Sequence, residues 1–441
     1  MAINTVPPHL PDLVIHRIIR LLPTKAAVRM SFLSKQWEGV LSSVPILDFD
    51  EGDENDNNLV RHRKFVDNIL KRYLELCKKE KQKQLLDKFR LCMTRYLSAD
   101  ATVVNEWLRY SMERSVKELD ISLRVDKSYW LWGGLRSYYC LSRKALANAN
   151  SITTLNLEYM RIKNISRFGS STAKPIRLLP SLKAMSLKNV HFDTNALLYL
   201  TGECPSMESL SLTSCSFANF EICVSNSSLR SFGVKQCKAG EIRVYEAVNL
   251  ESLTVVSSSF ELESMIFREC YNLKYMNIFA RHLKVFQLDG CYDVKATINA
   301  PKLCDFNFEG YLKSEFSLKA PKLWSASILL WDNWDGEFLN FDGPWKHLPR
   351  LRDFLGEFKA TKGMTLLVSH FKALIFPKEF RETFSSSSPK LLNLKVLDLA
   401  MENAPTNMRD KKDLTNSLLW IAPTLQEINQ LEYNEELEMY V

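Results

Sequence analysis

Apolar residues recur in one arrangement along most of the chain: an apolar residue, two others, a second apolar residue, one other, and a third. Alternate residues of a strand point to the same side, so this spacing places one loop residue and two strand residues in a single core. The copies are Ile152/Leu155/Leu157, Leu182/Met185/Leu187, Met207/Leu210/Leu212, Leu229/Phe232/Val234, Leu250/Leu253/Val255, Leu273/Met276/Ile278, Leu283/Phe286/Leu288, Leu303/Phe306/Phe308, Leu323/Ala326/Ile328 and Leu394/Leu397/Leu399, with a partial copy at Leu119/Ile121.

A finer period lies inside this arrangement. The last apolar residue of each short strand recurs every 10 to 12 residues from Leu212 to Ile328. Each coil of about 20 residues is therefore expected to hold two strands, and that period is typical of a leucine-rich repeat. Earlier copies are longer and contain a helical stretch such as 103–110. We expect an α/β repeat protein, a leucine-rich-repeat solenoid with strands on both sides of its middle coils and helices nearer its ends.

The pattern leaves one point of this solenoid open. The copies that end at Ile278 and Leu288 both have the form of the main strand, although they lie ten residues apart. Which set of strands lines the concave face is therefore not decided by the sequence.

The first 45 residues predict a compact helical module. Residues 10–22 form its first helix, with Pro11 in the first turn, where a missing N–H is harmless, and Pro23 at the end. Thr24 is a natural N-cap for a second helix and Ser34 for a third. The apolar stripe of the first helix is wider than packing on one neighbour requires. The part of the stripe that the neighbouring helices do not cover packs either on the rest of the chain or on a partner.

Motifs in this module have the spacing of an F-box. They are Leu10-Pro11-Asp12, Ile18-Ile19-Arg20-Leu21-Leu22-Pro23-Thr24-Lys25, Ala27-Val28 and Leu33-Ser34-Lys35-Gln36-Trp37. The chain resembles the plant F-box proteins that carry leucine-rich repeats. This resemblance implies that residues 8–45 dock on a Skp-type adaptor, which links them to a cullin and a RING subunit. It implies an apolar contact set of Leu10, Pro11, Val14, Ile15, Ile18, Leu22, Pro23, Val28 and Trp37, in which Val28 and Trp37 are also candidates for the module core.

The rest of the chain divides into two expected parts. The repeats are expected to fill residues 46–390, beginning with a short strand at 46–51 like the one that follows the F-box in this plant group. Residues 391–441 read as strand, helix and strand, and they resemble the opening of an FBD region. We expect them to form an incomplete, FBD-like C-terminal cap.

Charge is concentrated in one stretch. The chain has a net charge of +7, and residues 59–95 alone hold twelve Lys or Arg against four Asp or Glu. Apolar residues between 65 and 77 fall at helical spacing, which leaves the lysines on the other side of a helix. We interpret this as a solvated helix face. A nucleic-acid patch is the weaker alternative, because no aromatic interleaving or groove-reading element accompanies the charge.

Two insertions break the repeat rhythm. Residues 129–139 hold five aromatics around a Gly pair, and residues 331–338 mix aromatics with acids. Aromatic anchors with polar rims are typical of interface hot spots. These side chains either contact a target protein or fill irregular joints between coils. The candidates for target binding are Tyr129, Trp130, Trp132, Trp331, Trp334 and Trp345.

Composition narrows the class of protein. With 46% hydrophobic and 25% charged residues, the chain has the make-up of an ordinary globular protein. No apolar run reaches the roughly 18 residues of a membrane span, and the first residues lack the order of a signal peptide. Ten cysteines without a C-x-x-C pair indicate reduced thiols in a cytoplasmic or nuclear protein. Cys215, Cys237 and Cys291 fall in the Asn/Cys slot of the repeat.

The predicted function rests on these features taken together. The sequence contains no H-E-x-x-H, G-x-G-x-x-G, P-loop or G-x-S-x-G motif, so we expect no catalytic residue, no metal and no cofactor. The leading hypothesis is a non-catalytic substrate receptor of an SCF-type ubiquitin ligase whose repeats bind a target protein, with no nucleic acid or membrane as partner. One alternative is an interaction scaffold that joins no ligase. The other is a ligand-dependent sensor, which needs a deep pocket and a basic cluster, and the sequence shows no such cluster within its repeats.

Overall fold

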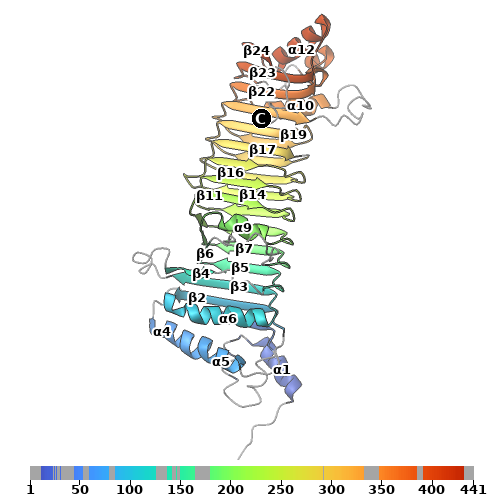
Figure 1. Ribbon diagram of the computed structural model, residues 1–441. Helices are drawn as coiled ribbons and strands as arrows, with labels where there is room; N and C mark the ends of the chain where they lie inside the picture. The colour runs from blue at the N-terminus through green and yellow to red at the C-terminus, as the bar shows by residue number, and fades with distance from the viewer. Residues whose placement is uncertain are drawn as a thin grey trace, which may run out of the picture. The chain divides into compact units, whose positions relative to one another are not determined.

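The structure is a computed structural model that describes residues 11–22, 24, 26, 30, 44–52, 59–78, 85–125, 137–141, 146, 149–163, 179–291, 293–331, 347–384 and 391–431. The chain forms two compact units, Met1–Met207 (unit 1) and Glu208–Val441 (unit 2). Within each unit, short parallel strands stack coil upon coil, which confirms the predicted α/β repeat fold (Figure 1). Among the helices described, none is long and apolar enough to cross a membrane.

Unit 1 contains a parallel sheet and a shorter second sheet. The first runs in the order β1 (Ile46–Asp50), β2 (Lys88–Tyr96), β3 (Glu118–Val125), β5 (Thr154–Glu158) and β7 (Ala184–Lys188). The second is formed by β4 (Tyr139–Leu141), β6 (Met160–Ile162) and β8 (His191–Phe192). The helices are α1 (Asp12–Leu21), α4 (Leu59–Lys64), the π-helix η2 (Phe65–Lys71), α5 (Arg72–Lys78), the 3-10 helix η3 (Ser98–Asp100), α6 (Ala101–Glu113) and α9 (Ala196–Gly202).

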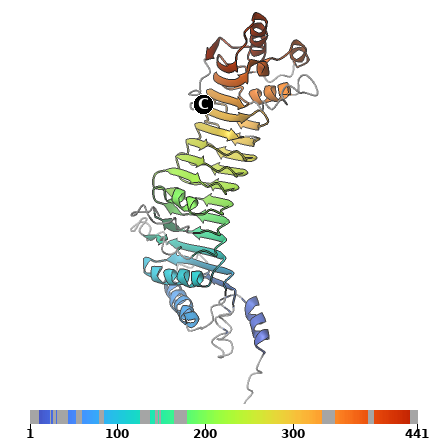
Figure 2. The same ribbon diagram turned by 45° about the vertical axis from the view of Figure 1, so that its right-hand side comes forward.

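Aromatic side chains hold the helices of unit 1 on its first sheet. Trp107 of α6 is fully buried, with its ring 4.8 Å from that of Phe49 in β1 and 5.5 Å from that of Phe89 in β2. Tyr73 of α5 stacks on the other side of Trp107 at 5.9 Å. Figure 2 shows α6 beside the end of this sheet. The helices predicted at 103–110 and 65–77 are both present, and the second includes the π-helical stretch of η2.

Unit 2 contains two long parallel sheets. The β9 sheet runs β9 (Ser209–Thr213), β12 (Ser231–Lys235), β14 (Ser252–Ser257), β16 (Tyr275–Ala280), β18 (Lys295–Asn299) and β20 (Glu315–Lys319). The β11 sheet runs β11 (Glu221–Ser225), β13 (Glu241–Tyr245), β15 (Ser264–Phe267), β17 (Val285–Cys291), β19 (Asp305–Tyr311), β21 (Ser325–Trp331), β22 (Gly363–His370), β23 (Val396–Asn403) and β24 (Glu427–Leu431). Unit 2 also contains the strand β10 (Ser216–Phe217), the helices α10 (His347–Gly356), α11 (Lys378–Thr383) and α12 (Met408–Ile421), and the 3-10 helix η5 (Phe371–Leu374).

The 10- to 12-residue period is the alternation between these two sheets. From β11 to β21, successive strands along the chain fall alternately in the β9 sheet and the β11 sheet, and alternate side chains are buried, as in β12 and β13. The two look-alike copies are thereby separated, because Ile278 lies in β16 of the β9 sheet and Leu288 in β17 of the β11 sheet. Both side chains are fully buried. A coil of this kind therefore has one strand in each layer, as the spacing predicted.

Cysteines occupy turns that the backbone makes in the left-handed region. Ser214 and Gln236 have φ of 53° and 52°, and each precedes a buried cysteine, Cys215 or Cys237. The Sγ of Cys215 donates to the carbonyl of Thr213 at 3.5 Å, across the turn. Cys291 is likewise buried, and its Sγ donates to the carbonyl of Cys270 in the previous coil. These thiols satisfy backbone groups inside the turns, as the repeat slot predicted.

The C-terminal segment continues the β11 sheet. Strand β23 pairs with β22, and β24 pairs with β23, all in parallel. Helix α12 lies between β23 and β24 in the chain and begins at the N-cap Asn407, whose side chain accepts from the N–H of Asp410 at 2.8 Å. The predicted order strand, helix, strand is present. The predicted domain boundaries at 45/46 and 390/391 stay predictions.

Candidate functional site

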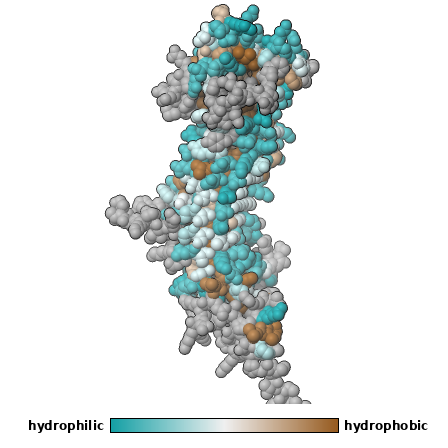
Figure 3. All heavy atoms as spheres, turned by 90° about the vertical axis from the view of Figure 1, so that its right-hand side faces the viewer, coloured by the Kyte–Doolittle hydropathy of each residue, from teal (hydrophilic) through white to brown (hydrophobic). Residues whose placement is uncertain are grey.

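Helix α1 exposes apolar side chains at the start of the chain. The N–H groups of Val14 and Ile15 bond to the carbonyl of Pro11 at 2.9 and 3.2 Å, which closes the first turn after a proline. In this turn the side chain of Ile15 is fully buried, whereas the side chains of Leu13 and Val14 are 83% and 41% exposed. In Figure 3 the surface at α1, near the lower end of the view, is hydrophobic. The helix thus has an anchored face and a free apolar face.

A hydrogen bond ties this module to the first strand of the sheet. Thr24, which is buried, accepts from the N–H of Asp48 in β1 at 2.7 Å. The bond connects positions 24 residues apart in the chain. It fixes the segment after α1 on the edge strand of unit 1, so that the helix and the repeats are joined through more than the covalent chain.

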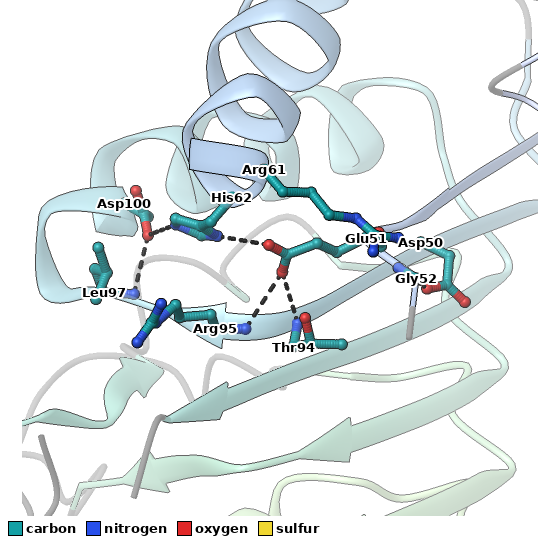
Figure 4. A network of polar contacts seen from close by, with 9 residues as sticks. All are labelled: Asp50, Glu51, Gly52, Arg61, His62, Thr94, Arg95, Leu97 and Asp100. Atoms are coloured by element: carbon teal, nitrogen blue, oxygen red, sulfur yellow. Dashed lines mark hydrogen bonds and ion pairs between the residues drawn. The ribbon is translucent and has the colours of Figure 1, made fainter. Parts of the chain in front are cut away.

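A buried polar network follows directly behind that strand (Figure 4). His62 of α4 is 1% exposed, and its two ring nitrogens lie 2.9 Å from Glu51 Oε1 and 3.0 Å from Asp100 Oδ2. The other oxygen of Glu51 accepts from the N–H groups of Thr94 and Arg95 at 2.8 and 3.3 Å. One histidine therefore links the residue after β1, helix α4 and the end of η3.

The electrostatics of this network favour a charged histidine. Burial alone would lower the pKa of His62, but its hydrogen bonds to Asp100 and Glu51 outweigh that effect and raise the pKa to about 9. Burial alone would raise the pKa of Glu51, and its contacts with His62 and Thr94 bring it below the ordinary value instead. An imidazolium between two carboxylates is the arrangement that results at neutral pH. It is a structural clamp behind the module that joins helix α4 to the residue after β1 and to η3.

The predicted adaptor contacts divide between described and undescribed positions. Pro11 and Val14 are exposed, and Ile18 and Leu22 are half-buried. Ile15 is fully buried, so we leave it out of the surface that a partner could touch. Leu13 lies on the free face and, at 83% exposure, is about twice as exposed as Val14, although the resemblance did not point to it. Leu10, Pro23, Val28 and Trp37 lie outside the described residues.

Of the predicted target contacts, the structure places Trp331. It ends β21, is 42% exposed, and donates from Nε1 to Glu309 Oε1 at 3.1 Å. Tyr129, Trp130, Trp132, Trp334 and Trp345 lie outside the described residues.

The outer face of the β9 sheet is a second exposed surface. Its central row consists of small polar residues in register across the strands. Two aromatics stand beside that row on β16, Tyr275 at 57% exposure and Phe279 at 45%. Aromatic anchors among small hydrogen-bonding side chains suit a protein interface. The row comprises Ser211, Gly233, Thr254, Asn277, Thr297 and Ser317.

Sequence reasoning missed the His62 network. It placed 59–95 as a solvated basic helix, and Arg61, Arg63 and Lys64 are indeed exposed. The available signal was spacing, because His62 lies three and four residues before the buried Phe65 and Val66 and so continues the apolar face by one turn. Its carboxylate partners, 11 and 38 residues away, carry no such signal.

Comparison with protein families identifies both halves of this arrangement. A model of the F-box domain matches residues 7–49, which include α1, Thr24 and most of β1. A second model, described as "FBD-associated F-box protein At5g56370, LRR repeats", matches residues 104–292, which begin in α6 and end after β17.

The chain is similar to several curated F-box proteins. The FBD-associated F-box protein At4g13985 of Arabidopsis thaliana is 30% identical over 229 residues, 51% of this chain and 46% of the relative. The F-box/FBD/LRR-repeat protein At2g26030 of the same plant is 28% identical over 233 residues, again 51% and 46%. The FBD-associated F-box protein At5g22730 is 28% identical over 202 residues, 46% and 38%. The matched stretch thus spans less than half the length of these relatives.

Proposed function

Since the chain is an F-box/leucine-rich-repeat protein of the plant type, we propose that it is a substrate-recognition subunit of an SCF-type ubiquitin ligase. The F-box would dock on a Skp-type adaptor, which brings a cullin and a RING subunit. The repeats would hold a target protein, so that ubiquitin transfer is accelerated by proximity and not by a catalytic residue of this chain. The observation that carries the proposal is the free apolar face of α1 inside the F-box match.

A partner is expected to cover the free apolar face of α1 because exposing apolar side chains to water is unfavourable in free energy. Burying a Leu or Val side chain contributes about 1.5–3 kcal/mol. Most of Leu13 and about two fifths of Val14 are exposed, while Ile15 is fully buried in unit 1. A partner helix or groove that covers Leu13 and Val14 recovers this free energy, and the charged Arg17 on the same exposed side supplies a polar rim.

Capture of a Skp-type adaptor tests the proposal. We expect the full wild-type chain to retain the purified adaptor on a pull-down resin. The double variant Leu13→Asp, Val14→Asp should weaken retention by about a hundredfold or more, because two carboxylates would be buried without partners. The matched control is Met408→Asp, which places a carboxylate on an apolar side chain of similar exposure, 81%, in unit 2.

The outcomes separate the proposal from the alternatives. The control should bind the adaptor like the wild type, and circular dichroism should show that all three chains are folded. A folded wild-type chain that retains no adaptor would refute the ligase proposal and leave the scaffold alternative. The double variant also provides the bait for affinity capture of the target, because a chain that cannot join the ligase cannot promote turnover of what it binds.

The target itself would bind on the repeats. The β9 sheet offers Tyr275 and Phe279 beside the row of small polar residues, and Trp331 ends a strand of the β11 sheet. We place the complex in the cytoplasm or nucleus, supported by the nine cysteines whose side chains the structure describes, which are all free thiols.

A further inference from the structure

Lysines that are far apart in the sequence lie together at one edge of the β11 sheet. The residues directly before β17, β19, β21, β22 and β23 form a continuous backbone ladder, in which each N–H bonds to the carbonyl of the equivalent residue one coil earlier. Along the chain the ladder reads Lys284, Cys304, Trp324, Lys362 and Lys395. Parallel strands lie about 4.8 Å apart, so these five positions span about 19 Å.

The turns that lead into these strands add further cations. Leu283, Leu303 and Leu323 each bond back to an alanine three residues earlier, which leaves the intervening residues at the surface. The turn segments 280–284, 300–304, 320–324, 358–362 and 391–395 contain no Asp or Glu, and Glu357, next to the fourth segment, accepts from the N–H of Leu318. We call their exposed cations the basic edge: Arg281, Lys284, Lys302, Lys322, Lys359, Lys362 and Lys395.

Few of these cations are neutralised within the chain. Lys284 pairs with Glu263 at 2.7 Å, and Lys302 lies 2.9 Å from the ring of His282. Lys362 lies over the ring of Trp324, 4.3 Å from its centroid. For Lys322, Lys359 and Lys395 the structure shows no ion pair with any described residue. Like charges stacked at this spacing repel one another. An anionic partner that lies along the edge relieves this repulsion and is attracted by several cations at once.

The equivalent edge of the β9 sheet shows the opposite design. There the ladder reads Glu208, Arg230, Glu251 and Lys274, and Lys295, the first residue of β18, donates its N–H to the carbonyl of Lys274. Glu251 lies 3.9 Å from Arg230 and 3.4 Å from Lys274, and Lys295 lies 3.4 Å from Glu315. The two edges thus differ in charge, one balanced and one basic.

We infer that the basic edge binds an acidic, extended polypeptide segment, on the premise that the repeats hold a protein. Side chains on one side of an extended peptide recur about every 6.8 Å, so four of them span about 20 Å, which matches the length of the ladder. A single-stranded nucleic acid fits less well, because it stacks successive bases on several aromatics. The described ladder holds one aromatic, Trp324, and Lys362 already lies over its ring.

Binding of a labelled poly-Glu peptide to the full chain tests this inference. Fluorescence anisotropy at about 50 mM salt should show binding that weakens as salt is added. The triple variant Lys322→Gln, Lys362→Gln, Lys395→Gln should bind about tenfold more weakly. The matched control is Arg230→Gln, Lys274→Gln, Lys295→Gln, which removes the same charge from the balanced edge and should stay within about twofold of the wild type.

A second readout locates the peptide. Trp324 is 59% exposed, and an acidic segment that draws Lys362 away should change its emission. That change should be missing in Trp324→Phe. Equal weakening in both triple variants, no peptide binding to the wild type, or an emission change that survives in Trp324→Phe would overturn the inference. So would a poly-dT oligonucleotide that binds more tightly than poly-Glu and is lost in the first triple variant.

Adaptor capture by the same variants keeps the two proposals separate. Both triple variants should retain the Skp-type adaptor like the wild type, since every substitution lies in unit 2. Loss of adaptor capture by the wild type would refute the ligase proposal alone, and the peptide measurements would still decide the basic edge.

Discussion

At neutral pH a protonated His62 lies between Glu51 and Asp100 inside unit 1. Its pKa is raised from 6.5 to about 9, so its stabilising contribution is complete below pH 6.5 and is lost as the pH rises to about 9. The contribution of Glu51 to stability depends on pH in the opposite direction, because its pKa is lowered. Its pKa lies below 4.5, so its contribution is present above that value and is lost as the pH falls further. Together they make the clamp strongest between about pH 4.5 and 6.5.

Replacing His62 by Gln should remove this pH dependence. At about 1.4 kcal/mol per pKa unit, the wild type should lose up to about 3 kcal/mol of unfolding free energy between pH 6 and 9.5 that the variant does not lose. Urea denaturation of the full chain at both pH values measures the difference. His282→Gln, at a surface histidine of unit 2, is the control and should follow the wild type. Parallel pH profiles for the wild type and His62→Gln would show that the imidazolium adds no stability.

At the scale of strands, the pairing of β17 with β19 is irregular at one point. The register between them shifts after Leu288, where Cys291 pairs with Gly310. A Cβ on Gly310 would overlap the carbonyl oxygen of Cys291 and the ring of Phe308. Glycine is therefore required at this point by the distance between two strands.

Gly310→Ala should destabilise unit 2 by about 1–3 kcal/mol, since neither the backbone carbonyl nor the packed ring can move away easily. Gly233→Ala is the matched control in strand β12, because the nearest atom to its added Cβ, Ser211 Oγ, lies at an ordinary 3.9 Å. It should change stability by no more than about 0.5 kcal/mol. Midpoints of urea denaturation compare the two. Equal losses would mean that the close approach relaxes without cost.

Elements were predictable from the sequence where they depend on local spacing. The alternating apolar residues of β12 to β21 and the helical stripe of α6 follow from periods of 2 and 3.6 residues. The free face of α1 was predicted from its overly wide stripe, although which residue is most exposed, Leu13, was not. The glycine at position 310 was unpredictable, because its role depends on a register shift between strands 20 residues apart.

For the whole molecule, the sequence showed a net charge of +7 and assigned it to residues 59–95. Outside that stretch the chain sums to 7 − 8 = −1, and this near neutrality hid two edges of different charge in unit 2. Lys302, Lys322, Lys362 and Lys395 are 20 to 40 residues apart in the sequence, so no local window contains a basic cluster. Only the stacking of coils brings them to one edge. The basic cluster thought missing from the repeats is therefore present in three dimensions.

Stacking also determines how far a local defect spreads. In a repeat array each coil contacts mainly its neighbours. Phe286 of β17 is fully buried, with its ring 6.1 Å from Phe267 of β15 and 5.3 Å from Phe306 of β19. Phe286→Ala should cost about 3–5 kcal/mol through the cavity it leaves. That loss should be confined to the coils that share the stack.

Hydrogen exchange followed by mass spectrometry measures this confinement. In Phe286→Ala, the amides of β15, β17 and β19 should lose protection, while those of β9 and β23 should keep it. Phe376→Ala is the reciprocal control, because its buried ring contacts Phe380 and Trp420 near the C-terminal helices. It should expose α11 and α12 and spare β15. If either variant lowers protection equally from β9 to β24, the strands of unit 2 unfold as one cooperative block, and nearest-neighbour stacking does not limit the spread of the defect.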